Sequence, residues 1–221
     1  MNGSLKSPNH IAMPWVLGLY ALGGGTFVIA AVMARWYGGP QSPPYLVPFV
    51  AAFGGLAQLL AGMWAYAADD VLGTAMLGTW GSFWLGYAML TGLLSSGRLS
   101  APAGAFPELA FWFIAAAAIT WIGTVAATRV AAVLVWVFGL FAIASTLAAI
   151  ATGFGLYGLS VLSGWVFVIG SIVAWYGASA MLLNETFDRE MLPVGWGVEA
   201  TTRPRSVTGQ PVEGAAARRA S

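Results

Sequence analysis

Long apolar segments alternate with short polar connections along most of the chain. Each apolar segment reaches the roughly 20 residues that a helix needs to cross a bilayer about 30 Å thick. The segments that this pattern predicts as membrane-spanning helices cover residues 13–32, 45–66, 72–94, 108–127, 130–150 and 159–183. The connections contain proline, glycine and acidic residues, which end helices. The pattern therefore predicts an all-α, polytopic membrane protein with six transmembrane helices.

The two ends of the chain depart from this pattern. Residues 1–11 are polar, and from about residue 196 the chain is rich in Pro, Gly and Arg, a composition typical of disordered segments. We therefore predict three parts: an N-terminal tail of residues 1–11, a six-helix transmembrane domain of residues 12–195, and a disordered C-terminal tail of residues 196–221.

The basic residues predict the orientation in the membrane. An even number of spans places both termini on one side, and cytoplasmic segments carry an excess of Lys and Arg. With the termini inside, the outer loops contain only Arg35 and Arg98. The inner segments then contain Lys6, Arg129, Arg189, Arg203, Arg205, Arg218 and Arg219. We expect a multi-pass plasma membrane protein with both termini cytoplasmic, and the Ala- and Gly-rich composition suggests a bacterial inner membrane.

Composition narrows the chemistry. The chain is 59% hydrophobic and 8% charged, whereas soluble proteins average about a quarter charged residues. It has no Cys and one His, which argues against disulfides, thiolate metal sites, haem and zinc. Its sole lysine, Lys6, lies outside the spans, so a retinal Schiff base is excluded. No catalytic triad or phosphate-binding loop is placed where it could work. The net charge of +1 says nothing about nucleic acid, and we expect no nucleic-acid partner. We expect no enzyme activity, cofactor or metal.

Gln58 is the candidate pore-facing residue. It is one uncharged amide within roughly four helical turns of apolar residues. A buried amide in a membrane helix is costly unless a neighbouring helix or a water-filled path satisfies it, so a helix–helix hydrogen bond is the alternative. The polar side chains that such a path would offer are Gln58, Thr79, Ser82, Tyr87, Thr120, Ser145, Thr146 and Asn184.

Small residues predict close contacts between helices. Gly23-Gly24-Gly25 indicates either close packing or a local helix break that lines a pathway. Two faces could also support contacts between protomers: Thr74, Gly78, Ser82 and Gly86 on one helix, and Gly170, Ala174 and Ala178 on another. The pair Asp69-Asp70 favours a cap on the next helix, with cation binding as the alternative.

Several separated motifs occur together in one known family. In the first motif, Pro14, Leu17, Gly18 and Leu19 agree with the family, whereas its Asn is replaced by Met13 and its second Pro by Val16. The further motifs are Phe53-Gly54-Gly55-Leu56-Ala57-Gln58, Gly81-Ser82-Phe83-Trp84, Leu183-Asn184-Glu185-Thr186-Phe187 and Leu192-Pro193-Val194-Gly195. The chain thus resembles the acetate uptake transporters, also called acetate and succinate permeases.

The resemblance implies a homo-hexamer in which each protomer has its own narrow pore for acetate, succinate and related small carboxylates, either channel-like or proton-coupled. Combined with the polar side chains above, it gives the substrate-pathway residues Pro14, Leu17, Gly18, Leu19, Gln58, Thr79, Ser82, Tyr87, Asn184 and Glu185. The pair Asn184-Glu185 could instead be an ordinary helix end. The resemblance also implies a hydrophobic constriction at Leu22, Trp80 and Phe138, where the family has Phe, Tyr and Leu. The Trp80 N–H can donate to a carboxylate but cannot accept a hydrogen bond.

The sequence is also compatible with two other functions. The first is a channel for a small neutral solute such as urea, a short amide or ammonia. The second is a membrane sensor or assembly factor that binds a partner through its Arg-containing tail. For the carboxylate transporter, the absence of ionisable residues from the middle of every span predicts that the proton crosses with the anion as the neutral acid.

Overall fold

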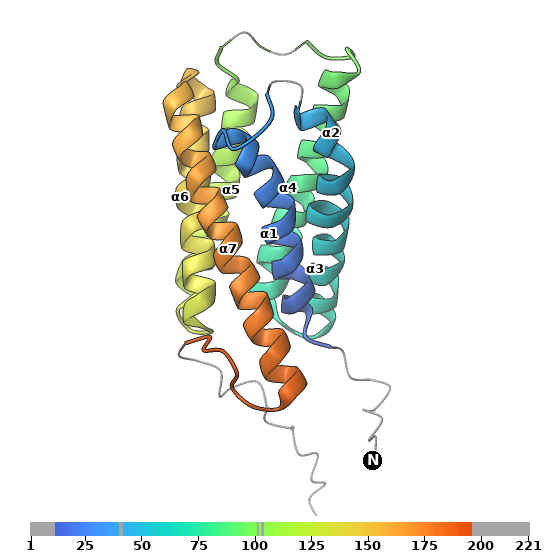
Figure 1. Ribbon diagram of the computed structural model, residues 1–221, viewed down its shortest axis with the longest axis vertical. Helices are drawn as coiled ribbons and strands as arrows, with labels where there is room; N and C mark the ends of the chain where they lie inside the picture. Colours follow the sequence, from blue (N-terminus) through green and yellow to red (C-terminus); the bar gives the residue numbers. More distant parts are fainter. Residues whose placement is uncertain (1–11, 40–41, 101, 103, 196–221) are drawn as a thin grey trace, which may run out of the picture.

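Every regular element that the computed structural model describes is a helix, over residues 12–39, 42–100, 102 and 104–195 (Figure 1). The elements are α1 (Pro14–Met33), α2 (Ser42–Phe49), a π-helical segment η1 (Val50–Ala57), α3 (Gln58–Ala67), α4 (Val71–Ser95), α5 (Pro107–Ala127), α6 (Ala132–Phe154) and α7 (Tyr157–Phe187). The all-α prediction is confirmed. The predictions for residues 1–11 and 196–221 lie outside the described residues.

The helices build the six predicted crossings. Within the described part of the chain, five segments are long and apolar enough to span a membrane: α1, the continuous run Ser42–Ala67 formed by α2, η1 and α3, then α5, α6 and α7. The sixth, α4, has 25 residues and so extends about 37 Å, but Gly, Thr and Ser interrupt its apolar sequence. Because α4 runs beside α3 along the bundle, it completes the set (Figure 1).

Local sequence explains where several helices begin and end. Proline stands in the first turn of α1 and of α5, where its missing N–H costs nothing. The Asp70 carboxylate caps α4 by accepting a hydrogen bond from the N–H of Gly73 at 2.8 Å, which confirms the capping prediction. Gly155, in the left-handed conformation with φ 66°, ends α6.

The start of α1 and the end of α7 lie at the same end of the bundle, which we call the terminal end (Figure 1). Since successive spans alternate in direction, α4 and α6 also begin there, and α3 and α5 end there. Both described ends of the chain therefore lie on one side, as an even number of spans requires.

The glycine-rich middle of α1 is a packing surface. Helix α1 is continuous through Gly23–Gly25, so the close-packing interpretation is confirmed and the predicted alternative of a break is wrong. A Cβ on Gly25 would fall on the Cα of Gly54, and one on Gly23 would lie 2.7 Å from the Trp175 ring. Helix α1 therefore approaches both η1 and α7 at backbone distance.

The two faces of small residues have different neighbours. Gly170, Ala174 and Ala178 are buried inside the protomer, with Gly170 against Phe141, so their predicted role in contacts between protomers is wrong. On α4, the middle of the predicted stripe stays open: Ser82 is exposed, and a Cβ on Gly78 would meet nothing within 4 Å.

Candidate functional site

The Gln58 side chain lies in the interior of the bundle and is fully buried at 0% exposure. Neither its Nε2 nor its Oε1 has a hydrogen-bond partner among the residues that the structure describes. Leaving a buried polar group unpaired costs about 1–3 kcal/mol in folding free energy. The helix–helix hydrogen bond considered as the alternative is therefore not formed. Both polar atoms of the amide lie in the interior, free to hydrogen-bond to a substrate.

The π-helical segment η1 positions this amide, because it ends immediately before Gln58. Pro48, inside α2, has no N–H to donate to the carbonyl one turn earlier. Directly afterwards the backbone hydrogen bonds change from the α-helical i to i−4 spacing to the π-helical i to i−5 spacing. Gly54 and Gly55 lie within η1 and let α1 and α4 approach it closely: a Cβ on Gly54 would stand 3.0 Å from Gly25 Cα. A continuous apolar sequence predicts only a helix, so nothing at the sequence level indicated the π segment.

Trp80 is the centre of an aromatic cluster in the core. Its ring centroid lies 5.1 Å from those of Phe83 and Phe141 and 6.2 Å from that of Phe167. Its indole N–H donates to the Thr120 hydroxyl at 3.1 Å, and that hydroxyl donates to a backbone carbonyl of α5. The Trp80 N–H, which the sequence indicated as a donor to a carboxylate, therefore already donates to Thr120.

Leu22 and Phe138, the other two predicted constriction residues, are also fully buried. The ring of Phe138 lies 6.1 Å from that of Trp15. Trp80 instead packs against Phe141, which comes one helical turn after Phe138 on α6, so the contact with Phe138 is nearer the terminal end. The interior is thus closed by at least two successive layers of apolar side chains.

Three further buried polar atoms have no partner over the described ranges: Thr26 Oγ1, Trp84 Nε1 and Ser145 Oγ. Trp84 packs against Gly54, one helical turn before Gln58, and Thr26 follows Gly25, which touches Gly54 from α1. Sequence reasoning named Ser145 but missed the other two. The position of Thr26 four residues after Leu22, on the same helix face, was the signal that could have found it.

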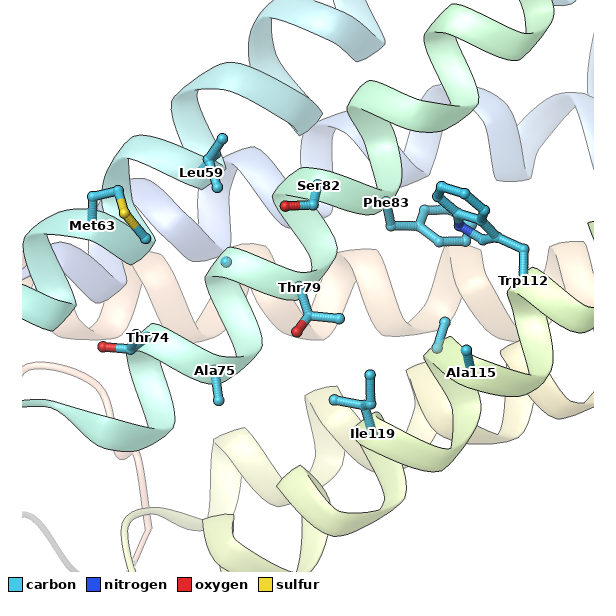
Figure 2. A pocket seen from close by; sticks show the side chains of 12 residues that line it. Leu59, Met63, Thr74, Ala75, Thr79, Ser82, Phe83, Trp112, Ala115 and Ile119 are labelled. Atoms are coloured by element: carbon cyan, nitrogen blue, oxygen red, sulfur yellow. The ribbon is translucent and has the colours of Figure 1, made fainter.

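Thr79 and Ser82 lie away from this interior. They line a lateral groove of about 650 Å³ between α3, α4 and α5. Figure 2 shows Leu59 and Met63 reaching this groove from α3 and Ile119 from α5. The structure does not bring these two predicted pathway residues together with Gln58.

Tyr87 lies further along α4, towards the end opposite the termini. Its ring is 5.6 Å from that of Trp84, and its side chain lines a second hollow of about 470 Å³. Glu108 and Trp112 of α5 border the same hollow. Tyr87 therefore lies between Trp84, whose buried N–H has no partner in the described part of the chain, and the hollow at that end of the bundle.

At the terminal end, Asn184 organises the chain that follows α7. Its Oδ1 accepts hydrogen bonds from the N–H groups of Met191 and Leu192 at 2.7 and 3.0 Å, and its Nδ2 donates to the Leu192 carbonyl at 2.9 Å. These bonds to the chain after α7 support the helix-end interpretation. Glu185 is exposed on the last turns of α7.

The four predicted pathway residues of α1 point in different directions. Pro14 opens the helix, Gly18 packs against Leu77 of α4, and Leu17 is half-buried. Leu19 is fully buried and shares the inward face with Leu22. Of the four, Leu19 is the one that the structure aligns with the central residues.

Comparison with known proteins assigns the chain to a family. A sequence model described as the GPR1/FUN34/yaaH family matches residues 2–193. The chain belongs to this family. It is 30% identical over 183 residues to the ammonia transport outward protein 2 of Saccharomyces cerevisiae, covering 80% of this chain and 64% of the yeast protein.

A bacterial relative and a solved structure extend this result. The chain is 30% identical over 145 residues to the succinate-acetate/proton symporter SatP of Escherichia coli K12, covering 65% of this chain and 75% of that protein. It superimposes on the structure of the bacterial acetate channel SatP with a TM-score of 0.78 and 26% identity, over 84% of this chain and 100% of the other. The predicted resemblance is confirmed.

Proposed function

We propose that the protein transports acetate and related small carboxylates, including succinate, along the axis of its helical bundle. The polar step of this pathway is Gln58, with Leu22, Trp80 and Phe138 closing the path beside it. The observation that carries the proposal is the fully buried amide of Gln58 with both of its polar atoms unpartnered in the described structure. The printed names of the relatives supply the class of substrate.

The hydrogen-bonding groups of the amide suit a protonated carboxylic acid. The acid offers one O–H donor and one carbonyl acceptor, and the amide offers N–H donors and one carbonyl acceptor. The two groups can therefore form a pair of hydrogen bonds that satisfies Nε2 and Oε1 together. A carboxylate anion would leave Oε1 unpaired and would carry its charge into an apolar layer, which costs several kcal/mol or more.

This pairing supports proton-coupled transport without a proton relay. The sequence has no Asp, Glu, Lys, Arg or His in the middle of any predicted span. In such a path the proton travels on the substrate, because no side chain is available to carry it separately. The proposal is therefore that of a transporter or channel, as the relatives' names describe, and not of an enzyme.

The setting of the protein is part of the proposal. Residues 12–195 form the transporter domain in a bacterial inner membrane, with both tails cytoplasmic as the distribution of basic residues favours. The protein assembles as a homo-hexamer with lipid around it. The open middle of the α4 stripe, at Gly78 and Ser82, supports a contact with a neighbouring protomer.

Ammonia is the second candidate substrate, because one relative is named an ammonia transport outward protein. The chain covers 64% of the length of that yeast relative, so its activity does not carry over directly. Ammonia is small and neutral, and Gln58 can also hydrogen-bond to it. Transport measurements separate the two.

The test is a competition experiment in proteoliposomes that contain the purified full chain. We expect saturable uptake of radiolabelled acetate that unlabelled acetate and succinate inhibit, and that equal concentrations of urea or an ammonium salt at constant pH leave unchanged. Uptake of labelled methylammonium that acetate does not inhibit, without acetate uptake, would instead support the ammonia channel.

A further inference from the structure

Trp15 has an unusual place for a residue at the start of a membrane helix. It lies in the first turn of α1, where the preceding Met13 is 39% exposed, yet Trp15 itself is only 7% exposed. A Trp near a helix end is typically an interfacial anchor that faces lipid headgroups. Here the indole instead turns into the bundle and occupies its terminal end.

The indole joins three parts of the bundle. Its N–H donates to Oδ2 of Asp70 at 2.5 Å, and Oδ1 of the same carboxylate is held by the N–H of Gly73. The other side of the indole faces α6, where its ring centroid lies 6.1 Å from that of Phe138. Asp70 is therefore a fixed acceptor that holds the Trp15 ring across the gap between α1, α4 and α6.

Trp15 also stands in line with the proposed pathway. Trp15, Leu19, Leu22 and Thr26 follow one another at intervals of four, three and four residues, so they share the inward face of α1. Leu19 and Leu22 are fully buried behind Trp15, and Thr26 has one of the unpartnered buried hydroxyls. A solute moving along this face between Leu22 and the terminal end meets the indole of Trp15.

We propose that Trp15 is the gate at the terminal end of the pathway and that Asp70 holds it closed. The inference rests on the proposed function, because it assigns a role within the same pathway. The gate opens when the indole N–H leaves Asp70 and the ring leaves Phe138, and the width of the opening limits the size of the carboxylate that passes. Asp70 is a positioning residue, since it acts through Trp15.

A reporter cysteine measures the gate without relying on transport. The natural chain has no Cys, so Leu19→Cys introduces a single thiol directly behind Trp15. We would measure its rate of modification by a membrane-impermeant methanethiosulfonate reagent in the detergent-solubilised full chain. The rate is compared in four backgrounds: the unaltered chain, Trp15→Phe, Asp70→Asn and Trp121→Phe.

Trp121→Phe is the matched control. The Trp121 indole also donates to a side chain, the Thr146 hydroxyl at 3.3 Å, but it lies on the outer surface and is 44% exposed. The change removes an indole hydrogen bond of the same kind outside the pathway. Thermal unfolding of each variant shows that the fold is retained.

We expect Trp15→Phe and Asp70→Asn each to speed modification of the reporter by about tenfold, because a hydrogen bond to a charged group that holds the closed state is lost. Combining the two changes should add little, since both remove the same bond. Trp121→Phe should leave the rate unchanged. Equal rates in all four backgrounds, or equal acceleration by the control, would overturn the proposal.

The gate and the proposed function fail in different ways. If the reporter reacts as expected but the unaltered protein moves no acetate in proteoliposomes, the gate stands and the carboxylate pathway falls. If acetate is taken up but the rates do not respond to Trp15, only the gate falls. A second readout is size selectivity: Trp15→Ala should raise butyrate uptake relative to acetate uptake several-fold, whereas Trp121→Phe should not.

Discussion

Replacing Gln58 with leucine is expected to stabilise the protein and to abolish most of its transport. Leucine has nearly the same volume and no polar atoms, so the change removes two unpaired buried groups. Each unpaired group costs about 1–3 kcal/mol, so removing both should raise the free energy of unfolding by about 2–6 kcal/mol. Acetate uptake per folded protein should fall by at least roughly tenfold, because the substrate loses its hydrogen-bonding partner inside an apolar path.

The opposite signs of these two effects make the experiment decisive. The matched control for stability is Asn184→Leu, which removes an amide whose hydrogen bonds are all made to the chain after α7. That change should lower stability, because the backbone groups of Met191 and Leu192 lose their partner. If Gln58→Leu also lowers the stability measured by denaturant or thermal unfolding, the amide has a structural partner and the pathway role is wrong.

The second large effect is expected from Gly25→Ala. The added Cβ would fall on the Cα of Gly54, a backbone atom that cannot rotate away, so α1 and η1 must separate. Overpacking of this kind costs about 1–3 kcal/mol. The apparent melting temperature in detergent should fall by about 2–12 °C, on the scale of domains of this size. Transport should fall as well, because the same contact orients η1 and hence Gln58.

Gly139→Ala is the control for this change. Gly139 also lies inside a membrane helix, but its Cβ would meet only Thr124 Cγ2, at an ordinary contact distance of 3.6 Å. Alanine is favoured over glycine within a helix by about 0.5–1 kcal/mol. The melting temperature of Gly139→Ala should therefore stay equal or rise slightly. Equal behaviour of the two variants would show that the contact between Gly25 and Gly54 does not limit stability.

Much of the fold follows from the sequence, for reasons of length and polarity. A membrane helix must satisfy its own backbone hydrogen bonds, so apolar runs of about 20 residues between turn-forming residues determine the spans. Gly23–Gly25 and Asp70 act locally, as a packing surface and a helix cap, and both were predicted. The π segment η1 was not predicted, because it depends on the geometry of a hydrogen-bond ladder and the apolar sequence looks the same in either helix type.

The candidate site was predicted less completely, because a sequence does not show which way a side chain points within the bundle. Gln58 stood out as one amide in an apolar run. Thr79 lies one residue before Trp80 and Ser82 two residues after it. Successive residues in a helix are turned by about 100°, and these two face the lateral groove. Trp15 was missed as a functional residue because its partner, Asp70, is 55 residues away.

We propose that small carboxylic acids cross this protein in their neutral form. The most direct test measures the initial rate of radiolabelled acetate uptake into proteoliposomes at several external pH values and one fixed, sub-saturating total acetate concentration. Neutral acetic acid also crosses lipid alone, so the rate in protein-free liposomes is subtracted at each pH. The Gln58→Leu variant gives the background of a folded protein that lacks the polar step.

We expect the protein-dependent rate to rise by nearly tenfold for each unit from about pH 7 to about pH 5, because a carboxyl group with a pKa near 4 is neutralised in that proportion. The increase should be lost in Gln58→Leu. A protein-dependent rate that is the same at every pH would show that the anion itself crosses and that transport of the neutral acid is wrong.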